Sequence, residues 1–163
     1  MPVTEYGGRV DIIFNALGVV NRLNPAQLYE LELNFISDNI VRKMKEMKSI
    51  KEKANLLFGY IKDVNSKQAK EMANYFNSLN KEGKINFIQE VEEKGIYLHQ
   101  PPFWGNVGFD QLKEIYKKYS WIKPYKVFYK GKEMRKKLII GDEYVLKMKH
   151  EPKTKFSTRS TSY

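Results

Sequence analysis

Residues 10–33 read VDIIFNALGVVNRLNPAQLYELEL, and this stretch lays out the first elements of the fold. The apolar run from Val10 to Phe14 is typical of a short buried strand, and residues 15–18 are predicted to form a loop. Asn24 followed by Pro25 predicts a helix start, because an Asn side chain can cap free backbone N–H groups and proline at the first helical position loses no hydrogen bond. An apolar face at helical spacing follows, at Leu28, Leu31, Phe35 and Ile36.

The middle of the chain, residues 41–123, is predicted to be mostly helical from its apolar spacing and cap residues. It shows no group of side chains with recognisable chemistry, so we interpret it as a scaffold. The expected boundaries are a capping box over residues 49–52, a cap at Ser66 before residues 67–79, a break at Gly83, a stop at Gly95, and a helix from Phe109 to Tyr119 opened by Asp110. The stretch GIYLHQPPFWG, residues 95–105, is expected to be an extended aromatic loop packed on the core, since proline excludes helix.

After Pro124 the apolar residues recur with a period of two, which predicts antiparallel strands. The strands are expected at residues 125–130, 134–140 and 143–150, with turns at Gly131 and Gly141. The predicted fold class is α+β in a single segment. Its expected parts are a short N-terminal strand, loop and helix over residues 1–40, a helical insertion over 41–123, and C-terminal antiparallel strands with a basic end over 124–163.

The composition excludes several classes of protein. The chain has no cysteine, which removes disulfides, a thiolate nucleophile and thiolate metal sites, and its two histidines, His99 and His150, are too few for a histidine-based zinc site. No apolar run reaches the length of a membrane span and no signal peptide is indicated, so a cytoplasmic protein is expected. We therefore expect neither a membrane contact nor a metal site in this chain.

The net charge of +10 is concentrated toward the C-terminus. Residues 1–40 carry two basic and five acidic groups (−3), whereas residues 124–163 carry eleven basic and four acidic groups (+7). This distribution indicates a polyanionic partner such as nucleic acid or nucleotide phosphate, although many basic faces are only solvated surface. The basic end, KMKHEPKTKFSTRSTSY (residues 147–163), therefore has two interpretations at this point, a disordered tail or a functional segment.

No autonomous active site is visible in the sequence. Asp11 and Asn15 have no nearby histidine, second carboxylate at helical spacing or glycine-rich phosphate loop. Arg22 differs, because it lies just before a capped helix, where free N–H groups and the positive end of the helix dipole favour an anion; a surface salt bridge is the alternative. An extended segment rich in Ser and Thr carries further candidates for contact with a phosphate backbone, namely His150, Lys155 and Arg159.

Two long patterns resemble the second-largest (β) subunit of multisubunit RNA polymerases. Residues 10–33 resemble the family segment PDIIFNPHGVPSRMTIGQLLE. Residues 141–163, GDEYVLKMKHEPKTKFSTRSTSY, resemble G-x-M-Y-x-L-K-L-x-H-x-V-D-D-K-x-H-A-R-S-T-G-x-Y. The two patterns occur in the family's order, with a variable insertion between them. The chain looks most like the polymerases of large bacteriophages, whose β subunits are often split over several genes.

The resemblance implies a segment of the hybrid-binding region of a DNA-directed RNA polymerase, a nucleotidyltransferase that is not active as this isolated chain. Arg22 matches the family arginine that contacts the triphosphate of the incoming NTP, and His150 matches the family histidine near the initiating nucleotide. Lys155 and Arg159 match basic residues of the segment that leads to the RNA–DNA hybrid, and Lys153, which precedes them, is expected to join this contact. No residue of the chain is expected to be catalytic.

The resemblance also implies components outside this chain. The catalytic Mg²⁺ would be held by aspartates of a β′-like partner subunit, the family's two lysine-bearing motifs are expected before the start of this sequence, and its Q-Q-P-L-G-G-K segment is expected after the end. The implied partners are other polymerase subunits or subunit fragments, the DNA template, the RNA–DNA hybrid and NTPs. The implied location is the cytoplasm of a bacterial host, or the virion if the protein is packaged.

The sequence departs from the family pattern at several positions. The family's Pro-His, Pro-Ser, Asp-Asp and second His are here Ala16-Leu17, Val20-Asn21, Lys153-Thr154 and Ser157, and the Gly after Arg-Ser-Thr is absent. These departures leave an alternative open, a catalytically inactive nucleic-acid-binding remnant or an inhibitor that contacts a polymerase. A basic structural protein, the third interpretation, explains only the charge.

Overall fold

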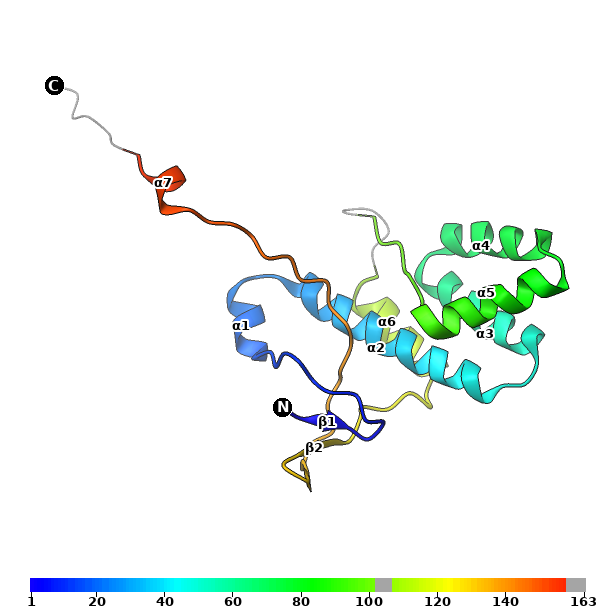
Figure 1. Cartoon of the computed structure of the whole chain (residues 1–163), viewed down its shortest axis with the longest axis horizontal. Coiled ribbons are helices and arrows are strands. Elements are labelled where there is room, and N and C mark those ends of the chain that lie inside the picture. Colours follow the sequence, from blue (N-terminus) through cyan, green and yellow to red (C-terminus); the bar gives the residue numbers. More distant parts are fainter. Residues whose placement is uncertain (102–106, 158–163) are drawn as a thin grey trace.

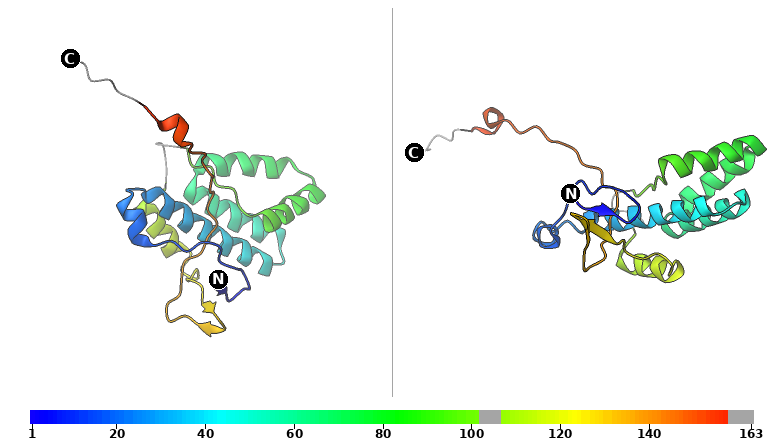
Figure 2. Two further views of the ribbon diagram at one scale, coloured as in Figure 1. Left: turned by 60° about the vertical axis from the view of Figure 1, so that its left-hand side comes forward. Right: turned by 60° about the horizontal axis from the view of Figure 1, so that its bottom comes forward.

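The structure, a computed structural model, describes residues 1–101 and 107–157 (Figure 1). Within these residues the elements are β1 (Val3–Thr4), α1 (Ala16–Asn21), α2 (Pro25–Glu46), α3 (Ile50–Val64), α4 (Ser66–Ser78), α5 (Lys81–Lys94), α6 (Phe109–Lys118), β2 (Val127–Tyr129), β3 (Lys132–Glu133) and α7 (Pro152–Lys155). Figures 1 and 2 show a helical body, a small sheet beside it, and a C-terminal segment that leads away from it. The helices and the antiparallel sheet confirm the predicted α+β class.

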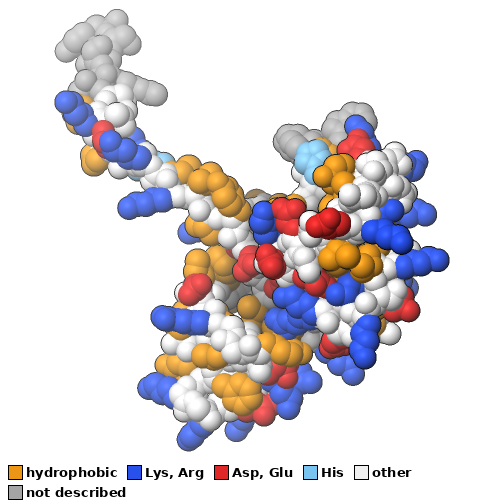
Figure 3. Space-filling model, turned by 45° about the vertical axis from the view of Figure 1, so that its right-hand side comes forward, with side chains coloured by type: hydrophobic (Ala, Val, Ile, Leu, Met, Phe, Trp, Pro, Cys, Tyr) orange, Lys and Arg blue, Asp and Glu red, His pale blue; other side chains and the backbone are white. Residues whose placement is uncertain are grey.

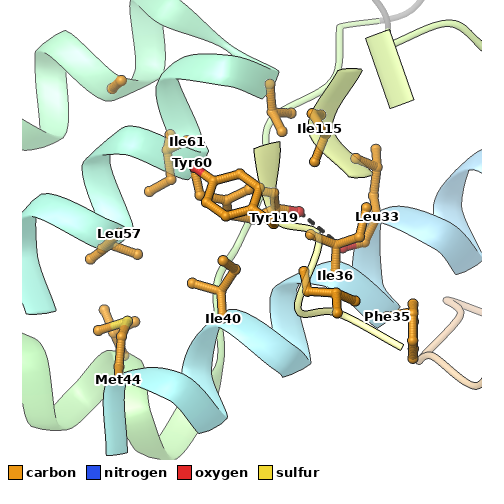
Figure 4. Close-up of a cluster of buried hydrophobic side chains, with 14 of the residues drawn as sticks. Leu33, Phe35, Ile36, Ile40, Met44, Leu57, Tyr60, Ile61, Ile115 and Tyr119 are labelled. Carbon is orange, nitrogen blue, oxygen red and sulfur yellow. Dashed lines mark hydrogen bonds between the residues drawn. The ribbon is translucent and has the colours of Figure 1, made fainter. Parts of the chain in front are cut away.

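Helix α2 is the axis of the core. Its side chains Ile36, Ile40 and Met44 recur at four-residue spacing and are fully buried. Figure 4 shows this stripe beside Leu57 and Ile61 of α3, with side chains of α6 nearby. Because burial of each large aliphatic side chain contributes about 1.5–3 kcal/mol, the stripe holds α2 and α3 together. Among the described helices, none is long and apolar enough to cross a membrane.

Buried hydroxyl groups also join α2 to α3. The Tyr60 hydroxyl donates a hydrogen bond to the Leu33 carbonyl oxygen at 3.0 Å and lies 3.0 Å from Ser37 Oγ. Ser37 Oγ donates to the same carbonyl at 2.9 Å. Burial raises the pKa of Tyr60 well above its ordinary value, so the phenol stays neutral. The relative position of the two helices is therefore specified by polar contacts as well as by packing.

The antiparallel sheet joins the N-terminal residues to residues 127–133. β1 pairs with β2, with Val3 opposite Phe128, and β2 pairs with β3. The residues between β2 and β3, Lys130 and Gly131, have φ of 49° and 76°, the left-handed values that a type I′ hairpin turn requires. The predicted turn at Gly131 is confirmed.

The strand predictions for residues 10–14 and 143–150 are wrong. Residues 10–14 form no strand, and the side chains of Ile12 and Ile13 are 55% and 67% exposed. Residues 143–150 form no strand either, and the third strand of the sheet is β1 from the other end of the chain. Alternation along a sequence indicates an extended backbone, but it does not say which segment lies beside it.

The predictions for residues 15–18 and 134–140 are also wrong in part. The first range lies mostly within α1 instead of a loop. The second range contains only an isolated bridge, in which Tyr125 and Leu138 exchange backbone hydrogen bonds of 2.8 and 2.9 Å. The regular pairing is limited to the short strands β2 and β3.

The predicted helices of the middle region are present, with corrections at their starts. Ser49 precedes α3 but makes no side-chain capping bond, so the predicted capping box is absent. Asn65, and not Ser66, caps α4, and its Oδ1 accepts hydrogen bonds from two backbone N–H groups at 3.1 Å. The helix α6 follows Gly108, and Asp110 lies inside its first turn.

The two glycine predictions for α5 have opposite outcomes. Gly83 lies within the first turn of α5 instead of breaking the helical pattern, because Asn80 caps the helix ahead of it. Gly95 ends α5 with a φ of 86°, as predicted.

Residues 96–101 lie outside helices and strands, as the prolines predict. Ile96 and Leu98 pack against the core, whereas the side chain of Tyr97 is 75% exposed. Phe103 and Trp104, the other aromatic residues of the predicted loop, lie outside the described residues.

Candidate functional site

Arg22 lies at the joint between α1 and α2. It is the C-cap residue of α1, and the next residue, Leu23, has a left-handed φ of 53°. The Leu23 N–H donates to the Val20 carbonyl at 3.0 Å and the Asn24 N–H to the Val19 carbonyl at 3.4 Å, the two bonds of a Schellman motif. Glycine usually occupies the left-handed position, so Leu23 carries a backbone strain of about 1 kcal/mol. The motif fixes where Arg22 stands relative to α2.

The start of α2 has the features of an anion-binding position. The helix is 22 residues long, has no acidic residue in its first turn, and receives no side-chain cap from Asn24, which corrects the predicted Asn cap. Arg22 is exposed, and its guanidinium forms no hydrogen bond or ion pair with the other described residues. A guanidinium beside the free N–H groups of a helix start can bind a phosphate or carboxylate.

The segment that follows the sheet docks on the first turns of α2. Asn34 Nδ2 donates to the Asp142 carbonyl at 2.5 Å, Gln27 Nε2 donates to Glu143 Oε2 at 3.1 Å, and the Tyr144 N–H donates to Glu30 Oε1 at 3.1 Å. These three bonds join residues more than a hundred positions apart in the sequence. Residues 142–144 are therefore held against α2.

Gly141 allows this close approach. A Cβ atom at this position would lie 2.6 Å from the Leu31 carbonyl oxygen and 2.9 Å from the Phe35 nitrogen, both backbone atoms that cannot move aside. The turn predicted at Gly141 is absent, and the glycine is instead a packing position. Sequence alone gives no sign of the contact, because its partner lies on a distant helix.

The basic residues of the C-terminal segment are exposed. His150 precedes the four-residue helix α7, which carries Lys153 and Lys155. Neither lysine forms an ion pair with another described residue, whereas Lys149 Nζ lies 2.5 Å from Glu151 Oε1. Arg159, the other predicted contact, lies outside the described residues.

The structure brings the two predicted regions together only where residues 142–144 contact the first turns of α2. The first turns of α2, which follow Arg22, hold the segment that precedes His150. Beyond Tyr144 the segment runs away from the body (Figures 1 and 2), and no hydrogen bond joins Arg22 to His150 or to α7. In the described residues, the C-terminal segment is therefore docked on α2 at residues 142–144 and projects from the body beyond them. The described residues form no enclosed active site.

The acidic and histidine side chains are not arranged to hold a metal ion. Within residues 1–101 and 107–157, no group of three or more such side chains has the required proximity.

The sequence comparisons identify similar proteins along the whole chain. The family model described as RNA polymerase Rpb2, domain 6, matches residues 1–163. The chain is 31% identical to the DNA-directed RNA polymerase subunit beta of Geobacter sulfurreducens over 98% of its length, and 33% identical to that of Aquifex aeolicus over 72% of its length. The matched stretches cover 12% and 8% of those two proteins, so the chain spans only a small part of the curated relatives.

Proposed function

The chain belongs to the family of RNA polymerase Rpb2, domain 6, and from this premise we propose that it works as part of a β-like subunit of a DNA-dependent RNA polymerase. The observation that carries the proposal is the family match over residues 1–163. The contacts between α2 and residues 142–144 support it, because they join the two segments that resemble the polymerase. The proposed role is to position substrates within a larger assembly.

Arg22 is proposed to contact the triphosphate of the incoming NTP. Its exposed guanidinium has no partner among the described residues, and the uncapped start of α2 lies next to it. Both features favour a phosphate, since the guanidinium supplies two parallel donors and the helix start supplies partial positive charge. Such a contact offsets the negative charge that develops on a pyrophosphate leaving group.

The projecting segment is proposed to contact the RNA–DNA hybrid. His150 would lie near the initiating nucleotide, and Lys153, Lys155 and Arg159 would face the phosphate backbone. The exposed positions of the two lysines on α7 support this role. Contacts to phosphates carry no sequence information, so this segment would hold any hybrid equally well.

The remaining parts of the reaction centre are proposed to come from partner chains. Mg²⁺ would be held by a β′-like large subunit. Further β fragments, the DNA template and NTPs complete the proposed assembly. Its proposed setting is the cytoplasm of a bacterial host, as for a split bacteriophage subunit.

Purification of the tagged chain from cells that express the whole transcription apparatus tests the assembly. We expect mass spectrometry to identify a β′-like subunit and further β fragments in the same complex, which should synthesise RNA from a DNA template. A chain that elutes without any polymerase subunit would contradict the proposal and favour the inactive remnant. A complex with an intact polymerase that blocks its RNA synthesis would favour the inhibitor.

Replacement of Arg22 by Ala in that complex tests the nucleotide contact. We expect the NTP concentration for half-maximal rate to rise by the equivalent of about 1.5–3 kcal/mol, because a charged hydrogen bond is lost. Arg9→Ala, at another exposed arginine near the N-terminus, is the matched control and should leave the NTP dependence unchanged. Equal NTP dependence in Arg22→Ala and the parent would remove Arg22 from the site.

A further inference from the structure

Residues 96–100 belong to no regular secondary-structure element and run as a strand-like segment beside α4. The degree of exposure alternates along it, with Ile96, Leu98 and Gln100 half-buried and Tyr97 and His99 exposed. This period of two is the pattern of a strand that lies with one face on the core. The strand belongs to no sheet among the described residues.

Side chains of α4 and of its N-cap residue form hydrogen bonds along one edge of this segment. Gln68 Nε2 donates to the Tyr97 carbonyl at 2.6 Å, Gln68 Oε1 accepts from the His99 N–H at 2.9 Å, and Asn65 Nδ2 donates to the His99 carbonyl at 2.8 Å. Backbone groups of successive strand residues point to opposite edges. Those of the even-numbered residues in 96–100 therefore point away from α4, and they form no hydrogen bond with residues 1–101 or 107–157.

A groove of about 830 Å³ runs along the same strand. Residues 94–100 line it together with α2 and residues 142–144. Much of the lining is apolar and includes Tyr29, Leu33, Leu98 and Val107. A chain that entered the groove would cover apolar surface and reach a strand with an unpaired edge.

The groove is acidic, although the chain as a whole is basic. Its lining contains four carboxylates, those of Glu30, Asp38, Asp142 and Glu143. The single lysine, Lys94, lies 2.7 Å from Glu90, so its charge is already compensated. Burial, and secondarily the nearby Asp142, raise the pKa of Asp38, while Arg42 and Lys45 oppose the shift. Figure 3 shows acidic side chains gathered on the face between the body and the start of the C-terminal segment.

We propose that this groove binds an extended, basic segment of a partner protein, which adds as a strand to the open edge of residues 96–100. The backbone of the partner would pair with the even-numbered residues, as in other complexes formed by strand addition. Lysine or arginine side chains at alternate positions would meet the four carboxylates, and apolar side chains between them would face the groove lining. The groove lining includes none of Arg22, His150, Lys153 or Lys155, although Ala26 in the first turn of α2 belongs to it.

The chemistry of the groove favours this occupant over others. An acidic or nucleic-acid ligand would meet like charge at the four carboxylates, which disfavours it. A helical ligand would leave the backbone groups of the strand unpaired, because its own N–H and C=O groups are already bonded within the helix. An extended basic chain satisfies the charge, the apolar lining and the backbone at once.

A fluorescent peptide of about seven residues that alternates lysine and valine tests the proposal, since it can span the five-residue edge. We expect saturable binding to the full chain by fluorescence anisotropy, and no binding of a peptide with glutamate in place of lysine. Asp38→Asn combined with Asp142→Asn should weaken binding about five- to tenfold, as expected for two lost charge contacts. Glu71→Gln combined with Glu114→Gln, which removes two exposed carboxylates outside the groove, is the matched control.

Two further measurements test the strand geometry. Methylation of alternate backbone nitrogens on one edge of the peptide should abolish binding, whereas methylation on the other edge should not. Amide hydrogen exchange of Leu98 should slow when the peptide binds. Equal affinity of the glutamate peptide, or equal weakening by the control pair, would overturn the proposal. It would also be overturned if binding appeared only after Lys147, Lys149, Lys153 and Lys155 were changed to Gln, because the chain's own basic end would then be the occupant.

Discussion

The side-chain amide of Asn39 donates a hydrogen bond of 2.9 Å to the hydroxyl of Tyr125, which joins α2 to the segment that leads into the sheet. The Tyr125 ring is 2% exposed and packs edge-on against Phe35, with 4.9 Å between ring centroids. The Arg42 guanidinium lies over the rings of both Tyr125 and Tyr6, at 4.5 and 3.8 Å from their centroids. Burial raises the pKa of Tyr125 to about 12, so its hydroxyl stays protonated at neutral pH.

Replacement of Tyr125 by Phe tests the contribution of this bond. We expect the free energy of unfolding to fall by about 1 kcal/mol, because the Asn39 amide loses one buried partner. Urea titration measures the change, and a double-mutant cycle with Asn39→Ala separates the pair from its surroundings. Tyr129→Phe is the control, because this tyrosine is 48% exposed and its hydroxyl forms no hydrogen bond with the described residues. Equal effects of the two Tyr→Phe changes would refute the assignment.

Replacement of Gly141 by Ala tests how the C-terminal segment docks on α2. The added Cβ would meet backbone atoms at 2.6 and 2.9 Å, so we expect the segment to shift at a cost of about 1–3 kcal/mol. Amide hydrogen exchange of Tyr144 should become faster, because its N–H would lose Glu30 as an acceptor.

Gly59→Ala is the matched control for that change. A Cβ on Gly59 would meet only the Tyr119 hydroxyl, at an ordinary 3.8 Å, and the residue lies inside α3. Alanine should therefore stabilise the helix by about 0.5–1 kcal/mol. If Gly141→Ala left the amide exchange of Tyr144 unaltered, as the control should, the close approach of Gly141 to α2 would not govern docking.

The stability of the chain should depend on the ionisation of Asp38. Its pKa is raised, first by burial and then by Asp142, while Arg42 and Lys45 oppose the shift. A raised carboxyl pKa means that the folded state prefers the proton, so this contribution is present at low pH and is lost as the pH rises through the folded pKa. Asp38→Asn should therefore raise the free energy of unfolding at neutral pH by about 0.5 kcal/mol, a value reduced for solvent screening. The melting temperature should rise with it.

The pH profile of that variant provides the check. The gain should disappear as the pH falls toward the ordinary Asp pKa of 3.8, where the parent carboxyl is also protonated. Thermal unfolding followed by circular dichroism at several pH values measures it. A gain that is the same at all pH values would assign the effect to packing instead of charge.

Neutralisation of Lys153 and Lys155 tests the projecting segment. If each lysine contacts one phosphate, the slope of log affinity against log salt should become shallower by about 0.7–0.9 per lysine changed to Gln. Salt titrations with an RNA–DNA hybrid measure this slope. Lys67→Gln with Lys70→Gln removes the same charge from exposed positions on α4 and should leave the slope unchanged. An equal response of both pairs would reduce the effect to net charge.

Local sequence signals predicted the helices well but their ends less well. Pro25 marks the start of α2 because proline is tolerated only where no backbone donor is needed, and Gly95 marks the end of α5 because glycine adopts a left-handed φ readily. Leu23 adopts a similar conformation without that signature. The joint that positions Arg22 was therefore invisible in the sequence, since tertiary packing offsets the local strain.

By itself, the sequence determined the α+β class, most of the helices and the family, because periodicity and long motifs are properties of neighbouring residues. Only the tertiary structure decided that β1 pairs with β2, that Gly141 packs on α2, and that one edge of residues 96–100 has no partner among residues 1–101 and 107–157, beside an acidic groove. These relationships join segments distant in the chain. Their energy comes from packing and hydrogen bonds that exist only once the core has formed, and no local pattern encodes which partner each segment meets.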